Sequence, residues 1–424
     1  MGNSLPKRLR PSRWYGVLLV CVFLGSTPVG ASPESHAAAT RLARQGVNAL
    51  LDVKLDRAKA IFDRLQQKYP NYPLSGFLHA SVYWVRAEAA QGDEQRKAQN
   101  MGIQRLEQAI IQAKAALKKT PNDPYWRLDL GMSLFFAARL YHDQGQILVT
   151  YNYARHGRDE LRELLKTHPE MEDAYFVLGM YEYIAGSVPR ALHWLTVLFD
   201  ISGSRSLGVK YLERATSHAP LMAPEAARIL LAAAAIQPEY NRPCEYRPLA
   251  IYMYDRFNGN PYFSMALQLI DAHCGYPEEA LALNGFAHKK YLKRYPGLRS
   301  TLELVQLQAY RSLGDLKHID AMKPIFIKRD PSFWYLARAQ ALDVNGQRAM
   351  AMKIYEDLHW ASLYPSEYPE YGNIPDWVAD QVKLNRKTPF TRVQPKKMSM
   401  DASPRLQGVS PGEFRSVIEK FKVH

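Results

Sequence analysis

The chain has 424 residues, of which 47% are hydrophobic and 23% are charged, and its formal net charge is +14. This length suits two or three domains or one elongated repeat array, and the apolar fraction excludes wholesale disorder. Three cysteines are too few for a disulfide-dense scaffold, and no apolar run of about 18 residues is present from which a multispanning membrane protein could be built.

Residues 1–31 have the three parts of a secretory signal peptide. Four basic residues lie between positions 7 and 13, an apolar stretch covers 16–24, and Val29 and Ala31 are the small residues that a signal peptidase needs. The apolar stretch covers about half of a bilayer core, which disfavours a permanent span. We predict cleavage after Ala31, with an uncleaved anchor as the alternative. Cleavage would leave a net charge of +10, because the segment carries four positive charges and no negative ones.

Cys21 raises the alternative of a bacterial lipoprotein. Lipoprotein signals need a small residue directly before the cysteine, whereas Val20 precedes Cys21 and the apolar stretch continues beyond it. We therefore interpret Cys21 as part of the discarded segment.

From about residue 36 to residue 362 the pattern predicts one helix after another. Apolar residues recur at steps of three and four, and no long segment alternates with period two. The breaks contain Pro, Gly, Asn or Asp, as in YPNYP (69–73), TPNDP (120–124) and NGNP (258–261). The sequence therefore predicts an all-α fold with almost no sheet.

One spacing recurs within these helices, at steps of seven, five, four and three residues. The clearest copies are Gly46, Val53, Ala58, Phe62 and Leu65; Gly179, Gly186, Ala191, Leu195 and Leu198; and Ala339, Gly346, Ala351, Tyr355 and Leu358. A small first residue lets the second helix approach closely, and a turn glycine ends the first helix in a left-handed cap. Because one such hairpin cannot bury its own apolar face, several are expected to stack.

These residues make the chain resemble a tetratricopeptide-repeat (TPR) protein, most clearly at 173–195, and it is similar to exported bacterial TPR proteins. The resemblance implies an irregular TPR-like α-solenoid over residues 32–362. Helices near 94–118 and 124–145 are longer than a regular repeat allows, and 202–215 is interpreted as a short extra helix. Residues 363–424 are expected to form a Pro/Tyr-rich and basic tail, partly disordered, that packs partly on the last repeat and ends in a helix at 411–422.

The same resemblance implies a binding groove, because the first helix of each TPR hairpin lines the concave face. The groove residues are then Arg139, Asp173, Phe176, Met180 and Tyr183. Aromatic and arginine side chains are common anchors of protein interfaces, and Arg139 would hold an acidic group of a partner. For any single aromatic residue of the chain, a place in the core between repeats is the commoner outcome.

Cys244 and Cys274 are the two cysteines that remain after signal cleavage. Antiparallel helices at 247–257 and 262–274 would bring them to the same level, and export would place them in an oxidising compartment. We predict a disulfide bond between them, with two free thiols as the alternative.

The sequence contains none of the common motifs for nucleotide binding, nucleophilic catalysis or metalloprotease chemistry. The twelve histidines are scattered along the chain. Carboxylate pairs such as Glu278/Glu279 lie at expected helix starts, where their negative charge interacts favourably with the helix dipole. We expect no catalytic residues, no metal and no cofactor. The prediction is a non-enzymatic scaffold or adaptor that binds protein in the periplasm, or at the periplasmic face of the envelope, of a Gram-negative bacterium and aids assembly of an envelope complex. The alternative is an envelope protein whose basic surface binds anionic polysaccharide or lipid; nucleic acid is not an expected partner.

Overall fold

The computed structural model describes residues 33–188, 202–236, 243–257 and 259–394. Across these ranges the regular secondary structure is helical, with no strand, which confirms the predicted all-α class. The predicted signal peptide at 1–31, the predicted helix at 411–422 and the repeat residues Ala191, Leu195 and Leu198 lie outside the described residues. None of the described helices is long and apolar enough to span a membrane.

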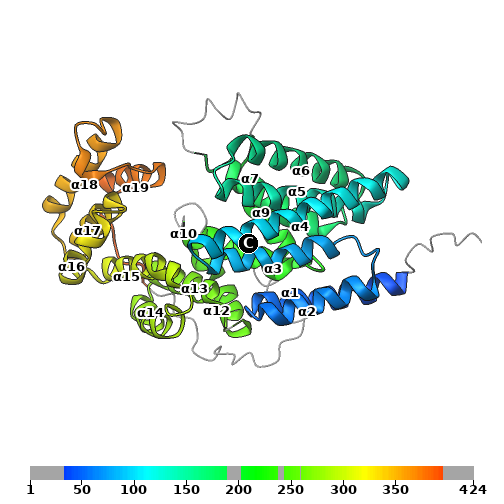
Figure 1. Cartoon of the computed structure of the whole chain (residues 1–424). Coiled ribbons are helices and arrows are strands. Elements are labelled where there is room, and N and C mark those ends of the chain that lie inside the picture. The colour runs from blue at the N-terminus through cyan, green and yellow to red at the C-terminus, as the bar shows by residue number, and fades with distance from the viewer. Residues whose placement is uncertain (1–32, 189–201, 237–242, 258, 395–424) are drawn as a thin grey trace, which may run out of the picture.

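The described helices follow one another along the chain (Figure 1). Those of the first part are α1 (Pro33–Leu51), α2 (Leu55–Lys68), α3 (Ser75–Ala89), α4 (Gly92–Lys119), α5 (Pro124–Asp143), α6 (Ile147–Thr167), α7 (Glu172–Ala185), α9 (Arg205–His218) and α10 (Ala223–Ile236). Those of the second part are η2 (Pro243–Tyr246), α12 (Arg247–Arg256), α13 (Pro261–His273), α14 (Pro277–Tyr291), η3 (Pro296–Leu298), α15 (Arg299–Leu313), α16 (Leu316–Phe326), α17 (Pro331–Val344), α18 (Arg348–Leu363), η4 (Pro369–Tyr371) and α19 (Asp376–Lys387).

Consecutive helices pack against one another to form a solenoid-like array with an inner and an outer layer. The inner helices contact the next inner helices along the series α1, α3, α5, α7, α10, α13, α15 and α17. The outer layer is made by the second helix of each pair, for example α2, α4, α6, α9, α14 and α18. In Figure 1, α16–α19 project to one side of the helices that precede them.

Small residues allow the paired helices to cross closely, as the spacing predicts. A Cβ atom at Gly46 in α1 would lie 2.2 Å from the ring of Phe62 in α2. One at Gly179 in α7 would lie 2.9 Å from the Leu212 side chain in α9. The latter contact corrects one prediction: α9 is the packing partner of α7 and not a short extra helix.

The turn glycines behave differently from one another. Gly314 and Gly346 have φ angles of 70° and 72°, so they end α15 and α17 in the left-handed region that glycine tolerates best. Gly186 has φ −73° and stays in the right-handed region. The predicted left-handed cap at Gly186 is therefore wrong.

On the inner face of the first part, helix α1 contacts residues near the starts of α10 and α13. The Asn260 side chain at the start of α13 donates a hydrogen bond to the Leu51 carbonyl oxygen over 2.9 Å, and Arg44 in α1 donates to the Pro220 carbonyl oxygen over 2.9 Å. One hydrophobic cluster runs from α1 to α15 and contains the inner sides of the helices between them. Side chains that would line an open groove in a wider superhelix are therefore packed together.

Residues 364–394 continue the folded array. Helix α19 packs on α17 and α18, and its Val378 and Val382 are fully buried. Arg392, beyond α19, forms an ion pair with Glu278 in α14 over 3.1 Å. The sequence analysis did not predict α19, because the Pro/Tyr-rich residues before it are typical of loops.

Candidate functional site

Three of the five predicted groove residues are not available to a partner. Asp173, Phe176 and Met180 are 5%, 0% and 6% exposed. The closure of the inner face buries them, so their assignment as accessible groove residues is wrong.

Asp173 has a structural role instead. Its Oδ1 atom accepts hydrogen bonds from the backbone N–H groups of Leu221 and Met222, over 3.1 and 2.8 Å, directly before α10. Burial raises its pKa to about 6, opposed by these two hydrogen bonds. A carboxylate at this place satisfies donors at the start of a helix that would otherwise be unpaired.

The other two predicted residues lie nearer the surface. Arg139 is exposed and forms an ion pair with Asp143, one turn further along α5, over 2.7 Å. Tyr183 in α7 is partly exposed. The five side chains therefore do not form one continuous binding surface.

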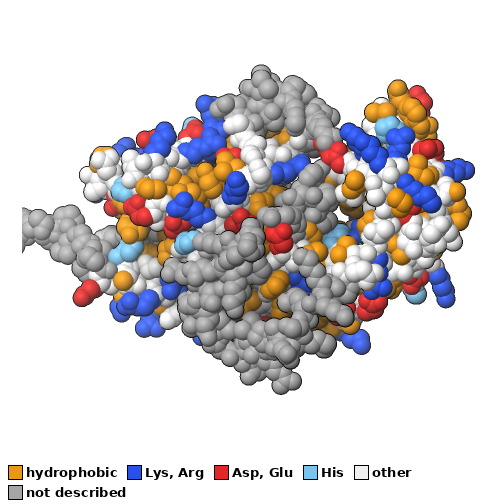
Figure 2. Space-filling model, turned by 180° about the vertical axis from the view of Figure 1, so that it is seen from behind, with side chains coloured by type: hydrophobic (Ala, Val, Ile, Leu, Met, Phe, Trp, Pro, Cys, Tyr) orange, Lys and Arg blue, Asp and Glu red, His pale blue; other side chains and the backbone are white. Residues whose placement is uncertain are grey.

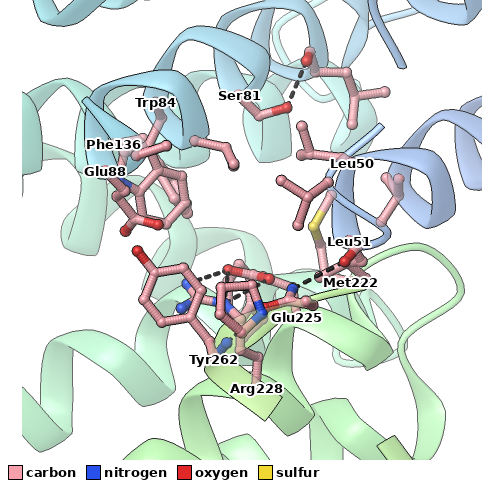
Figure 3. Close-up of a pocket in the computed structure, with 18 of the residues that line it drawn as sticks. Leu50, Leu51, Ser81, Trp84, Glu88, Phe136, Met222, Glu225, Arg228 and Tyr262 are labelled. Carbon is pink, nitrogen blue, oxygen red and sulfur yellow. Dashed lines mark hydrogen bonds and ion pairs between the residues drawn. The ribbon is translucent and has the colours of Figure 1, made fainter. Parts of the chain in front are cut away.

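A cavity of about 50 Å³ remains on the inner side of the array, among α1, α3, α5, α10 and α13 (Figure 3). Phe176, predicted as a groove residue, contributes to its lining. Figure 3 shows Trp84, Phe136 and Glu88 on one side, with Leu50 and Leu51 across the open space. Tyr262, Glu225 and Arg228 lie along a third side.

Arg228 and Glu225 form an enclosed ion pair on one turn of α10. Arg228 Nη2 lies 2.6 Å from Glu225 Oε1, and Arg228 Nε lies 2.9 and 3.0 Å from the two carboxylate oxygens. The guanidinium carbon also lies 5.8 Å from the centre of the Trp84 ring and 5.7 Å from that of Tyr262, within the range of a cation–π interaction. Despite burial, Glu225 and Glu88 raise the pKa of Arg228, so this residue stays charged.

Glu88 is the second carboxylate of the cavity. Its side chain is exposed to solvent and lies among the residues that line the cavity. Burial raises the pKa of Glu88; Arg228 opposes this shift and Glu225 adds to it. Burial, followed by the charge of Glu88, also raises the pKa of the Tyr262 hydroxyl. Both residues line this cavity.

A second hollow, of about 440 Å³, lies among α13, α15, α17 and α19. Three of its polar groups are linked: Arg311 donates one hydrogen bond to His273 Nδ1 over 3.0 Å and one to Gln340 Oε1 over 3.3 Å. Burial and the charge of Arg311 lower the pKa of His273 well below its usual value, so His273 is neutral. These groups hold inner helices together, whereas Glu88 in the first cavity has no such partner.

Cys244 and Cys274 meet beside this second hollow. The Sγ atoms of Cys244 and Cys274 lie 2.11 Å apart, which is disulfide-bonding distance, and the pairing is the predicted one. In the part of the chain that the structure describes, no group of three or more His, Cys, Asp or Glu side chains is placed to hold a metal ion.

Sequence reasoning missed the cavity residues Glu88, Glu225 and Arg228. A signal for one of them was present, because Arg228 interrupts the apolar sequence APEAARILLAAAAI of α10. A charge in such a helix requires a partner, since an unpaired buried charge is strongly unfavourable. No signal identified Glu88, because its position depends on the packing of distant helices.

Fold and cavity together define an all-α, solenoid-like protein with a charged pocket on its inner side. No protein-family model matches the sequence, and no curated protein is significantly similar to it.

Proposed function

We propose that this chain is a non-enzymatic scaffold protein of the cell envelope, related to TPR proteins, that binds a protein partner and aids assembly of an envelope complex. The observation that carries the proposal is the cavity on the inner side of a helical array, where the Glu88 carboxylate has no ion-pair partner among the described residues. A pocket with few convergent polar groups in an apolar surround is the usual form of a binding site. Solenoid-like arrays commonly bind their partners on their concave side.

The proposed location is the periplasm, or the periplasmic face of the envelope, of a Gram-negative bacterium. It draws on the signal-peptide pattern at 1–31, which lies outside the described residues. The cysteine pair at disulfide distance is compatible with export into an oxidising compartment.

The alternative, binding of anionic polysaccharide or lipid by a basic surface, draws on the net charge of the chain, which is +14 in full and +10 after the proposed cleavage. On the face in Figure 2, Lys and Arg side chains are spread among Asp and Glu side chains and are not gathered in one patch. We therefore favour a protein partner.

Site-specific photo-crosslinking in cells tests the proposed function. A leucine-sized diazirine amino acid replaces Leu50 at the cavity wall, and a control replaces Lys114, which is exposed on the outer helix α4. We expect one dominant protein to be captured from position 50 and not from position 114. Equal capture from both positions would contradict the proposal. The same would follow from capture of no protein together with salt-sensitive retention on envelope glycans or lipids, and that result would favour the alternative.

A further inference from the structure

Among the described charged groups around the cavity, the Glu88 carboxylate has no counter-ion of its own. Arg228 is bound by Glu225 through both carboxylate oxygens. Arg139, the next positive group that acts on Glu88, is bound by Asp143 over 2.7 Å. Each guanidinium therefore has its own counter-ion, and within the described ranges the Glu88 carboxylate has neither an ion pair nor a hydrogen bond to the protein.

The surroundings of Glu88 favour a cation. The Trp84 and Tyr262 rings already lie within cation–π range of Arg228, so their faces bound a region that stabilises positive charge. In Figure 3 the Glu88 carboxylate and the Tyr262 hydroxyl point toward one another at the edge of the open space.

The size of the cavity and its apolar wall indicate which kind of cation it can hold. About 10–15 Å³ is needed to admit one water molecule, so the cavity of about 50 Å³ accepts only a few non-hydrogen atoms. The end of a lysine side chain, Cδ–Cε–Nζ, has this size. Leu50, Leu51 and Met222 provide an apolar wall for its methylene groups (Figure 3).

We propose that the cavity binds a primary ammonium group, held by the Glu88 carboxylate between Trp84 and Tyr262. This inference rests on the proposed function in one respect: the ammonium group in the cell is then a lysine side chain of the protein partner. The pocket gives the scaffold an anchor for one residue of that partner. A charge-assisted hydrogen bond of this kind is stronger than one between neutral groups and gives specificity.

The test uses the mature full-length protein and n-butylammonium as the probe. The indole ¹H–¹⁵N resonance of Trp84, assigned by its loss in Trp84→Phe, reports occupancy of the cavity. We expect a saturable shift of this resonance in the wild type, and affinity at least about tenfold weaker in Glu88→Gln, since the variant keeps the shape and loses the charge. The matched control is Glu94→Gln at an exposed position in the first turn of α4, which should bind like the wild type.

Three results would overturn the inference: no saturable shift in the wild type, equal affinity in Glu88→Gln, or equal binding of neutral 1-pentanol. Circular dichroism and thermal unfolding of Glu88→Gln verify that it is folded, which is expected because Glu88 has no partner among the described residues. If the probe binds as expected and position 50 crosslinks to no protein, the pocket assignment stands and the scaffold function fails. If position 50 captures a partner and the probe does not bind, the scaffold function stands and the ammonium assignment fails.

Discussion

The side chain of Asn260 and the carbonyl group of Leu51 are 209 residues apart in the chain and are joined by a buried hydrogen bond of 2.9 Å. The same side chain caps α13, since its Oδ1 atom accepts a hydrogen bond from the Tyr262 N–H group over 2.9 Å. One asparagine therefore begins a helix and holds that helix against the end of α1. This link brings Tyr262 to the cavity that α1 and α3 also line.

Substitution of Asn260 should separate these two roles. Asn260→Ser keeps an oxygen that can cap α13 and loses the Nδ2 donor, which leaves the Leu51 carbonyl unpaired. We expect the free energy of unfolding to fall by about 1–2 kcal/mol, and Asn260→Ala to cost about 1 kcal/mol more because the cap is also lost. Urea unfolding followed by circular dichroism measures both. A serine variant as stable as the wild type would show that the link to α1 contributes no stability.

The close crossing of α7 and α9 leads to a prediction at Gly208. A Cβ atom there would lie 2.5 Å from the Tyr183 backbone nitrogen and 2.8 Å from the Gly179 carbonyl oxygen. Backbone atoms cannot move aside as the end of a side chain can, so the helices must separate. We expect Gly208→Ala to destabilise the protein by about 1–3 kcal/mol.

Gly285 provides the matched control, because it is an exposed position within α14 with no atom within 4 Å of an added Cβ. Alanine there should stabilise the helix by about 0.5–1 kcal/mol, since glycine loses more conformational entropy on folding. Thermal unfolding of both variants measures these changes in stability. Shifts of the same sign would mean that the close crossing is not the cause.

The sequence predicted what local physics determines. The helices follow from apolar residues at steps of three and four, and the Gly46–Phe62 contact follows from the small residue in the repeated spacing. The Cys244–Cys274 pair follows from two short antiparallel helices. All of these depend on residues close together in the chain.

The binding face could not be predicted in the same way. Whether Phe176 lines an open groove or lies in the core depends on the accumulated curvature of the array, which small rotations at each helix pair determine. The link between Asn260 and Leu51 reflects that curvature and has no signature in either local sequence. The same holds for Glu88, whose pKa is influenced by Arg228 only because α3 and α10 line one cavity.

The disulfide bond should contribute strongly to stability. It closes a loop with a sequence separation of 30 residues, which corresponds to about 3–4 kcal/mol if the bridge acts by restricting the unfolded chain. We expect a reductant to lower the unfolding temperature of the wild type and to leave a Cys244→Ala, Cys274→Ala variant unaffected. The intact mass should rise by two hydrogens on reduction. An unchanged mass would show that the two thiols are free.

Asp173 should make the stability of the protein depend on pH. Burial raises its pKa from 3.8 in the unfolded chain to about 6 in the folded protein, against the effect of its hydrogen bonds to Met222 and Leu221. Between these two values the folded protein holds a proton that the unfolded chain has lost. The stabilisation from this group is therefore complete below about pH 4 and is lost as the pH rises through about 6.

The variant Asp173→Asn tests this sign, because its amide oxygen still accepts the two backbone hydrogen bonds and does not titrate. We expect the free energy of unfolding to fall less steeply between pH 4 and pH 6 in this variant than in the wild type, measured as urea midpoints across that window. In this variant the free energy of unfolding should still fall somewhat with rising pH, since burial also raises the pKa of Asp271 to about 6, an effect that Arg247 opposes. Asp173→Ala serves as the control for the cap and should lose about 1 kcal/mol even at low pH. Parallel curves for the wild type and Asp173→Asn would mean that Asp173 titrates normally in the folded protein.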